Sequence, residues 1–589
     1  MRVALVGAEL EENLALRYMA AALESKGHDV DIVPFNSEED VPAAVTHAQR
    51  FQPQMVGLSM IFTGRAREFC HLAQTLRDSG YQGHLIAGGH FASFNCERLL
   101  NDYAAFDSIG LGEGEELICA LAEHPDQIAH IPGVCYRGPD GAPVINVSKG
   151  NPENLDALAF PKRTTFHEYF DKRIASILSS RGCWRNCAFC SINAWYERGG
   201  GKKFRVRSVE NIVAEMKELY FQHGVRIFNF QDDNFFLPHT EKALRRFEAL
   251  RAGLRREGVE GIAIAIKARP DSITQESIRV LDDLGLFRVF LGVENASENG
   301  LRNLNRKCEF DQILSALRIL NDFDVHVAFN LLMFEPETVL DDILINLRFI
   351  ERHLDNPFNF CRAEAYAGTG LEAKLVPEGR LLGDHFGFDY RLRDPYCEAF
   401  HQIANYAFFD RNFSDSGLHY FNMQVDFYFQ LLRRFYPETI TQTMRANVRN
   451  FIKRTNLDTY ERLCEIYDFV ASTDPKDQVS NRSFARQMRT RVDSGSAGLH
   501  AEGQRILDWL TAAHEKRAEP ARVMSIAQSP EEQSFLTCRI VPYQGIESLQ
   551  EMNLASFPSG VVDEPNWFGA LSTPVPYHEF RRRLAEHDA

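Results

Sequence analysis

The sequence lacks the features that would assign it to a membrane or to a nucleic acid. No window approaches the roughly 20 apolar residues that a membrane helix needs, and no block of Lys and Arg stands out in a chain whose formal net charge is -16. The opening stretch MRVALVGAELEEN has one Arg and a short apolar run, which is not the pattern of a signal or transit peptide. We therefore expect a cytoplasmic protein with no nucleic-acid partner and no membrane partner.

Low-complexity segments and repeats of solenoid period are also lacking. Hydrophobic residues make up 44% and charged residues 25% of 589 residues, a balance that predicts a globular protein of about three or four domains. Twelve cysteines are scattered along the chain. Because a reducing cytosol disfavours disulfides, clustered cysteines are expected to bind a metal instead.

Residues 1–125 alternate short apolar runs with amphipathic stretches of about 10 to 15 residues, which predicts a flavodoxin-like doubly wound domain of five parallel strands. Ligands of such domains bind at the carboxyl ends of the strands. The loops expected there are SMIFTGR (59–65), GGHFAS (88–93) and LGEGEE (111–116). Glycine allows a ligand to approach the backbone closely, although glycine-rich turns also serve as plain connections.

Residues 126–172 are rich in Pro, Gly and Asn and predict a connector with a central hairpin, YRGPDGAPVI. Residues 173–375 then repeat the strand and helix alternation. Six units are too few for a closed eightfold barrel, so we expect a partial (β/α)6 barrel with its functional groups at the carboxyl ends of the strands. The expected strands are 173–179, 226–233, 262–269, 288–295, 325–334 and 359–366.

Residues 376–589 predict a mainly helical domain that caps the open side of the barrel. Its aromatic helices would either shape an apolar pocket or form ordinary core. The polar stretch 493–498 predicts a loose segment without regular structure, and the tail 561–584, which includes EPNWFG, predicts a compact segment.

Three cysteines, Cys183, Cys187 and Cys190, fall within eight residues after the first barrel strand, and the next cysteine is Cys308. A structural zinc site needs four ligands. An iron-sulfur cubane held by three thiolates keeps one iron open for another ligand. The triplet therefore favours a cluster that takes part in chemistry.

The spacing C-x3-C-x2-C, with Phe189 before the last cysteine, resembles the signature of the radical S-adenosylmethionine (SAM) superfamily, and SSRGCWRNCAFCSI is similar to its cobalamin-binding branch. The upstream domain with ENLALRYMAAAL, GLSMI and GGHF resembles the cobalamin-binding domain of that branch. The resemblance implies a 4Fe-4S cluster on the three cysteines, SAM on the open iron, and cobalamin. It places cobalamin at Ser59, Met60, Ile61, Thr63, Gly64, Gly88, Gly89, His90, Gly112, Glu113 and Gly114.

The resemblance also implies residues that bind SAM. Phe189 would pack beside the adenine, and Asp232 and Asp233 would accept hydrogen bonds from the ribose or the amino group, unless one of them caps the following helix. Arg269 would grip the SAM carboxylate. The other implied contacts are Lys267, Glu294 and Ser297 in a turn similar to the usual GVES, and Arg306.

One departure concerns cobalt. Many cobalamin proteins carry D-x-H-x-x-G after the first strand, whereas GAELEENLA contains no His. The resemblance then implies cobalamin without a histidine ligand, with a group from Ile61 to Arg65 approaching cobalt. Arg65 would disfavour ligation of cobalt, or it would simply begin the third helix or pair with cobalamin amide or phosphate groups.

The resemblance implies a methyltransferase that moves a methyl group from SAM by way of methylcobalamin to a carbon of a small-molecule or natural-product precursor. A polar variant of this route, known for the indole of tryptophan, needs a general base, for which Tyr366 is the candidate. The alternatives are a cobalamin-dependent radical SAM cyclase or ring-contraction enzyme, and a non-catalytic sensor. We expect a monomer that receives electrons from a flavodoxin or ferredoxin.

Overall fold

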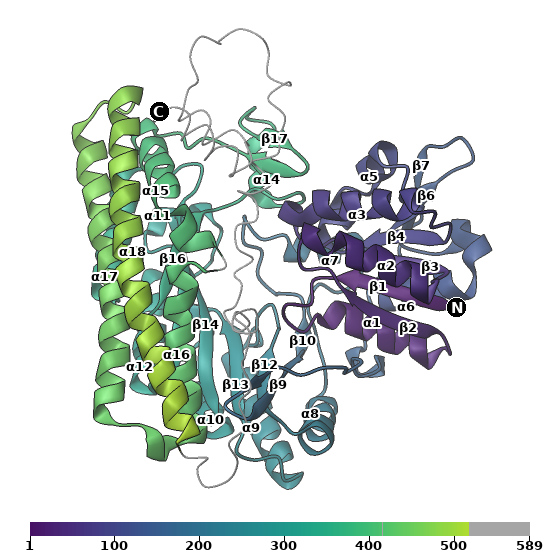
Figure 1. The fold of residues 1–589 in the computed structure, drawn as a ribbon, viewed down its shortest axis with the longest axis horizontal. Coiled ribbons are helices and arrows are strands. Elements are labelled where there is room, and N and C mark those ends of the chain that lie inside the picture. The colour runs from purple at the N-terminus through teal and green to yellow at the C-terminus, as the bar shows by residue number, and fades with distance from the viewer. Residues whose placement is uncertain (415, 517–589) are drawn as a thin grey trace.

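The computed structural model describes residues 1–414 and 416–516, and they form three parts (Figure 1). An N-terminal α/β domain lies on one side, a curved sheet with outer helices occupies the middle, and four long helices stand on the far side. The tail that the sequence predicted to be compact, 561–584, lies outside the described residues. Within the described ranges, no helix combines the length and the apolarity needed to cross a bilayer.

The first domain contains five parallel strands in the order β2-β1-β3-β4-β5, the flavodoxin-like arrangement that the sequence predicted. Helices α1 and α6 cover one face of the sheet, and α2, α3 and α5 cover the other. The strands are β1 (Arg2–Gly7), β2 (Asp29–Pro34), β3 (Met55–Ser59), β4 (His84–Gly88) and β5 (Ser108–Gly110). The helices are α1 (Leu14–Ser25), α2 (Val41–Phe51), α3 (Ala66–Asp78), α4 (His90–Phe94), α5 (Cys96–Asp102) and α6 (Glu115–Glu123).

The expected count of five strands is exceeded, because the predicted hairpin joins the same sheet. Strands β6 (Val134–Arg137) and β7 (Pro143–Ile145) pair antiparallel beyond β5 and bring the sheet to seven strands. Arg137 donates to the carbonyls of Leu100, Tyr103 and Phe106 and so fastens the hairpin to the domain. Part of the expected connector therefore belongs to the first sheet.

The second sheet is the partial barrel, with six parallel strands and a short antiparallel edge strand in the order β16-β15-β14-β13-β12-β9-β8. The strands are β8 (Glu168–Tyr169), β9 (Lys172–Ile177), β12 (Val225–Phe230), β13 (Ala263–Ala268), β14 (Leu286–Glu294), β15 (His326–Phe334) and β16 (Phe358–Arg362). Its longer helices are α8 (Val209–His223), α9 (Thr240–Arg256), α10 (Gln275–Leu284), α12 (Phe310–Asp322) and α13 (Leu340–Arg352). Shorter elements are β10 (Ser180–Arg181), α7 (Ile192–Gly199), β11 (Arg205–Val206), α11 (Glu298–Asn303), α14 (Gly370–Leu375), β17 (Leu382–Asp384) and β18 (Gly387–Asp389).

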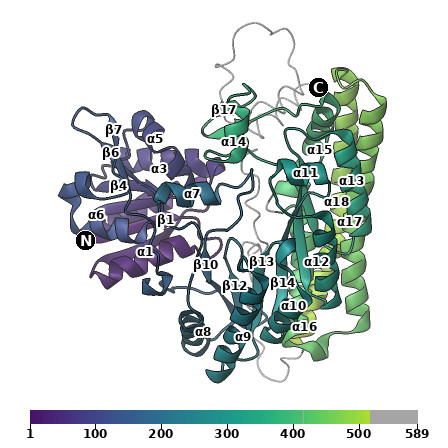
Figure 2. The same cartoon turned by 180° about the vertical axis from the view of Figure 1, so that it is seen from behind.

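The last four described helices are α15 (Pro395–Phe413), α16 (Leu418–Phe435), α17 (Gln442–Ser472) and α18 (Gln478–Glu515), which stand together in both views (Figures 1 and 2). Helix α16 crosses the amino-terminal ends of the barrel strands. Its Phe427 packs in a buried cluster with Phe287, its Asp426 pairs with His326, and its Arg434 donates to the Ile262 carbonyl at 3.0 Å. The helix closes the floor of the barrel and leaves the carboxyl ends of the strands for function.

The expectation of a loose segment at 493–498 is wrong, because these residues lie inside α18. This helix packs against α15, α16 and α17, and tertiary packing outweighs the poor helix propensity of Gly495 and Gly498. Two aromatic residues of α15 are core, as the ordinary interpretation expected: Phe400 and Phe408 are fully buried, whereas Tyr396 is exposed.

Candidate functional site

The cysteine loop lies between β10 and α7, and each of its sulfurs faces an N–H donor. The Cys183 sulfur accepts from the Arg185 backbone N–H, and the Cys190 sulfur from that of Ile192. Cys187 lies 3.2 Å from Nη1 of Arg306 and 3.7 Å from Nη1 of Arg269. Such donors stabilise sulfur ligands that carry negative charge.

Electrostatics agree with this arrangement. Burial raises the pKa of the Cys183 thiol and raises that of Cys190 to about 12, so thiolates here need compensation, and the two guanidiniums supply positive charge. Within residues 1–414 and 416–516, no three His, Cys, Asp or Glu side chains converge as they would around one metal ion. A 4Fe-4S cluster binds each thiolate at a different iron, so it does not require three ligands to converge on one ion.

Arg269 and Arg306 lie behind the cluster loop. Arg269 donates through Nε to Oδ1 of Asp271 at 2.9 Å and through Nη2 to the Arg306 carbonyl at 2.5 Å. Arg185 reaches the same Asp271 at 2.6 Å. The guanidinium that the sequence assigned to the SAM carboxylate is therefore used by protein groups, and its position beside Cys187 suits charge compensation of the cluster.

Glu294 and Ser297 differ in what they offer. Glu294 ends β14 with φ of 67°, a left-handed conformation that is costly for a non-glycine residue and clusters at functional sites. Its carboxylate lies 3.9 Å from Arg306, and burial raises its pKa. The Ser297 hydroxyl instead accepts from Gly300 N–H at 2.8 Å and caps α11. Ser297 thus has a structural contact where the motif implied a cofactor contact.

The two aspartates at the end of β12 also differ in their contacts. Asp232 is fully buried and accepts from the N–H and hydroxyl of Ser179 and from the Ser180 hydroxyl. Asp233 accepts from Gly182 N–H at 3.0 Å and borders a cavity. Burial raises the pKa of Asp233 to about 6, against the opposing charge of Lys267. Of the pair, Asp233 is the residue placed to meet a ligand.

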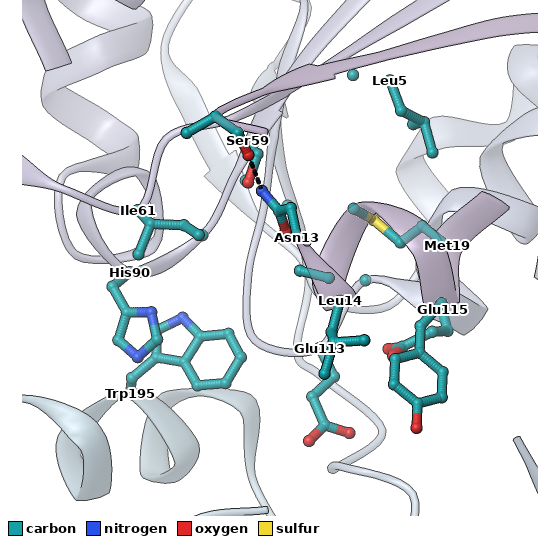
Figure 3. A pocket seen from close by; sticks show the side chains of 18 of the residues that line it. Leu5, Asn13, Leu14, Met19, Ser59, Ile61, His90, Glu113, Glu115 and Trp195 are labelled. Carbon is teal, nitrogen blue, oxygen red and sulfur yellow. Dashed lines mark hydrogen bonds between the residues drawn. The ribbon is translucent and has the colours of Figure 1, made fainter. Parts of the chain in front are cut away.

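That cavity, of about 500 Å³, opens at the carboxyl ends of the first sheet, where Ser59, Ile61 and His90 point into it (Figure 3). Its lining continues to Asp233 and Lys267 at the ends of β12 and β13. Its volume is typical of small-molecule sites. Several glycines line it, and a Cβ on Gly89 (φ 103°) would lie 2.8 Å from the Met60 carbonyl. Predicted residues that line it are Ser59, Ile61, Arg65, Gly88, Gly89, His90, Gly112, Glu113, Gly114, Asp233 and Lys267.

Other predicted residues lie away from the cavity. Met60 is buried beneath the loop, and Thr63 and Gly64 belong to the 3-10 turn that precedes α3. Phe189 packs on the edge of the barrel core. Tyr366 follows β16, and burial raises its pKa, with the Glu364 carboxylate as the next cause. A phenol with a raised pKa suits a hydrogen-bond donor rather than the general base that the sequence suggested.

Arg65 borders the cavity but is neutralised. Its Nε and Nη2 donate to Glu68 at 2.8 and 2.7 Å, and its Nη1 donates to the Phe35 carbonyl at 2.9 Å. It also precedes α3 as the residue before the first helical turn. The contacts favour the plainer of the two interpretations, in which Arg65 begins the helix. Ile61 presents an apolar side chain to the same wall.

Part of the wall comes from helix residues that were not among the predicted site residues. Helix α1 contributes Leu14, Tyr18 and Met19, and α7 contributes Trp195 and Tyr196. The signal for α1 was available, since it begins directly after the first strand end, where ligands of this fold bind. The contribution of α7 depends on how two domains pack, which no local pattern reports.

Buried ion pairs fix the two domains around the cavity. Arg181 contacts Glu113 at 3.1 Å and Glu115 at 2.6 Å, and Arg205 also pairs with Glu113. A second set joins Arg163 to Glu12 of the first domain at 2.6 Å and to Glu215 of the barrel. Glu113, predicted as a cofactor contact, is therefore part of the interdomain packing.

His90 gives the site a pH dependence. Its ring stacks on Trp195 with centroids 4.4 Å apart, and burial lowers its pKa from 6.5 to about 4. Between pH 4 and pH 6.5 the imidazole is therefore protonated in the unfolded chain and neutral in the folded chain. Because protons then favour the unfolded chain, the free energy of unfolding falls as the pH drops from 6.5 toward 4. We expect His90→Gln to make this fall less steep. Denaturant titration of cobalamin-free protein across this range measures it, and parallel curves for variant and wild type would contradict it.

Comparisons with known proteins agree with the geometry. Residues 177–349 match the family model described as Radical SAM superfamily, and residues 3–122 match the B12 binding domain. The chain is 28% identical over 335 residues to the hopanoid C-3 methylase of Methylococcus capsulatus, covering 54% of this chain and 61% of that protein.

Two solved structures share the fold. The cobalamin-dependent S-adenosylmethionine radical enzyme OxsB, with aqua-cobalamin bound, superposes with a TM-score of 0.61 at 16% identity, over 88% of this chain and 80% of that one. The radical S-adenosylmethionine methyltransferase TsrM from Kitasatospora setae, with tryptophan and a SAM analogue, gives 0.54 at 17% identity, over 64% and 76%. At these identities the likeness shows the fold alone.

The matched models and the site define a class: the chain joins a B12-binding domain to a radical SAM barrel. It belongs to the cobalamin-dependent radical SAM enzymes of the methyltransferase-like group, and its cofactors are a 4Fe-4S cluster, SAM and cobalamin. The residues present fit these groups, with Cys183, Cys187 and Cys190 for the cluster and the glycine-walled cavity for cobalamin.

Proposed function

We propose that the chain is a methyltransferase acting on a carbon of a small-molecule or natural-product precursor. The observation that carries the proposal is the continuity of the cavity, in which the strand ends of the first domain and Gln231, Asp233 and Lys267 of the barrel share one space. Bound together, the cofactors supply a transferable methyl group and an adenosyl radical. A substrate in this space would meet both.

The residues of the shared space suit the handling of protons and charge. Lys267 donates through Nζ to Gln231 Oε1 at 3.0 Å, which holds its charge at the strand end. Burial raises the pKa of Asp233 to about 6, nearer to the neutral range in which a general base works. A polar route therefore has a better placed base in Asp233 than in Tyr366.

The similarities support carbon as the acceptor without fixing the substrate. The hopanoid enzyme is named as a C-3 methylase, and the TsrM structure contains tryptophan, so an indole carbon is one substrate that we propose to test. Electron transfer from a flavodoxin or ferredoxin, a monomeric state and a cytoplasmic location stay predictions.

Product analysis tests the proposal. Anaerobically reconstituted protein is given cobalamin, SAM, a reductant and a panel of indole and aliphatic precursors. We expect S-adenosylhomocysteine and a product heavier by one CH2 unit; 5'-deoxyadenosine appearing in parallel indicates the radical route, and its absence indicates the polar route. 5'-Deoxyadenosine without a methylated product would overturn the proposal in favour of a cyclase or ring-contraction enzyme.

A further inference from the structure

Helix α7 follows the cluster loop in the sequence, yet it packs on the first domain, as both views show (Figures 1 and 2). Trp195 donates through Nε1 to the Ser93 hydroxyl at 3.2 Å, and its ring stacks on His90. Ser93 and His90 both belong to α4 of the first domain. Arg198 donates to the Cys96 sulfur at 3.3 Å. The helix therefore links the cluster loop to the cobalamin domain by direct contacts.

The first residue of α7 contacts the cluster ligand. The Ile192 N–H points to the Cys190 sulfur, and one turn later Trp195 N–H donates to the Ser191 carbonyl at 2.9 Å. Because a helix is stiff over a single turn, the position of Trp195 sets the position of the donor on Cys190.

The carboxyl end of α7 is held as well. Asn151 donates to the Tyr196 carbonyl at 2.9 Å, and Ser148 donates to the Gly199 carbonyl at 2.6 Å. Gly112 packs so closely that a Cβ there would lie 2.8 Å from Gly199 Cα. With this end fixed, the face of α7 that can respond to a ligand is the one that carries Trp195.

That face borders the cobalamin cavity. Trp195 and His90 both line it (Figure 3), and Nε2 of His90 is buried with no hydrogen-bond partner among the residues that the structure describes. A ligand that fills the cavity would pack on this pair and restrict its movement, whereas an empty cavity offers no such contact on that side.

We infer that Trp195 couples cobalamin binding to retention of the iron-sulfur cluster, by holding α7 and with it the N–H donor on Cys190. In this coupling Trp195 acts as a positioning residue, through α7. Because coupling between two sites is reciprocal, the cluster strengthens cobalamin binding by the same factor that cobalamin strengthens cluster retention. The inference depends on the cofactors alone and does not depend on the proposed substrate or product.

The test follows loss of iron to a chelator under anaerobic conditions, with and without saturating cobalamin. We expect cobalamin to slow the loss about 5- to 150-fold in the wild type, the fold-change that typical coupling free energies correspond to. The protection factor is the rate of iron loss without cobalamin divided by the rate with it. In Trp195→Ala this factor should approach one, even at cobalamin concentrations that saturate the variant. His90→Ala, which removes the stacking partner and leaves α7 intact, should lower the factor partly, and it carries the test if Trp195→Ala does not fold.

Trp184 provides a matched control, since it lies in the cluster loop on the other side and donates to the Phe236 carbonyl at 3.2 Å. Trp184→Ala should speed iron loss equally with and without cobalamin and keep the wild-type factor. Equal rates of loss in the wild type with and without cobalamin, or a wild-type factor in both Trp195→Ala and His90→Ala, would overturn the inference. A failed methyl-transfer assay would leave this result unaffected.

Discussion

Replacing Cys187 with Ala should remove the iron-sulfur cluster and reduce SAM cleavage to background, while cobalamin still binds, more weakly by the coupling factor inferred above. Cys187 is buried, and its sulfur faces both Arg306 and Arg269. Loss of the thiolate removes the sulfur that both guanidiniums face and leaves the cluster with two protein ligands. Iron and sulfide content, together with the absorbance of bound cobalamin, measure the two cofactors separately.

Cys308 is the matched control for this substitution. It is the next cysteine in the sequence, and its thiol lies near Arg306 and Arg269, where it could be mistaken for a fourth ligand. Its sulfur contacts the Glu309 carbonyl at 3.6 Å instead. Cys308→Ala should retain the full iron content and SAM cleavage. If it loses the cluster as Cys187→Ala does, the cluster has four protein ligands and no open iron for SAM.

The strands of both sheets could be predicted from sequence because parallel strands, buried on both faces, read as short apolar runs. The expected strand 325–334 is observed as His326–Phe334, and 262–269 as Ala263–Ala268. Side chains at strand ends followed from the same rule, since Asp233 and Lys267 both reach the cavity. Helix α18 could not be predicted through its polar, glycine-containing middle, because packing on three neighbouring helices determines it.

The functional residues, too, could be predicted in part from local sequence and in part only from the tertiary structure. A motif names the residue type, but the partner that a side chain finds depends on distant segments: Asp232 is used by Ser179 and Ser180, and Arg269 by Asp271. Trp195 was missed because its role arises from the docking of α7 on the first domain. Sequence patterns therefore predicted the loops of the candidate site. The role of each residue within a loop could be assigned only from its tertiary contacts.

Gly182→Ala should disrupt the cluster loop more than any other single methyl addition in it. Gly182 precedes Cys183 with φ of 86°, and a Cβ there would lie 1.7 Å from the Lys203 carbonyl oxygen and 2.9 Å from its carbon. Both contacts are backbone atoms, so a rotamer change cannot relieve them. The chain must shift, which moves Cys183 and breaks the Gly182 N–H contact to Asp233.

Gly224 separates this clash from the cost of backbone conformation. It follows α8 with φ of 70°, and a Cβ there meets no atom of the described part of the chain within 4 Å. Gly224→Ala should cost about 1 to 2 kcal/mol for the left-handed conformation alone and retain its iron. Gly182→Ala should destabilise the cluster loop by more than about 4 kcal/mol, the range of severe single substitutions. The variant should therefore bind little iron. Iron content and thermal unfolding of both variants measure the difference, and a full cluster in Gly182→Ala would show that the position of Cys183 tolerates displacement of its loop.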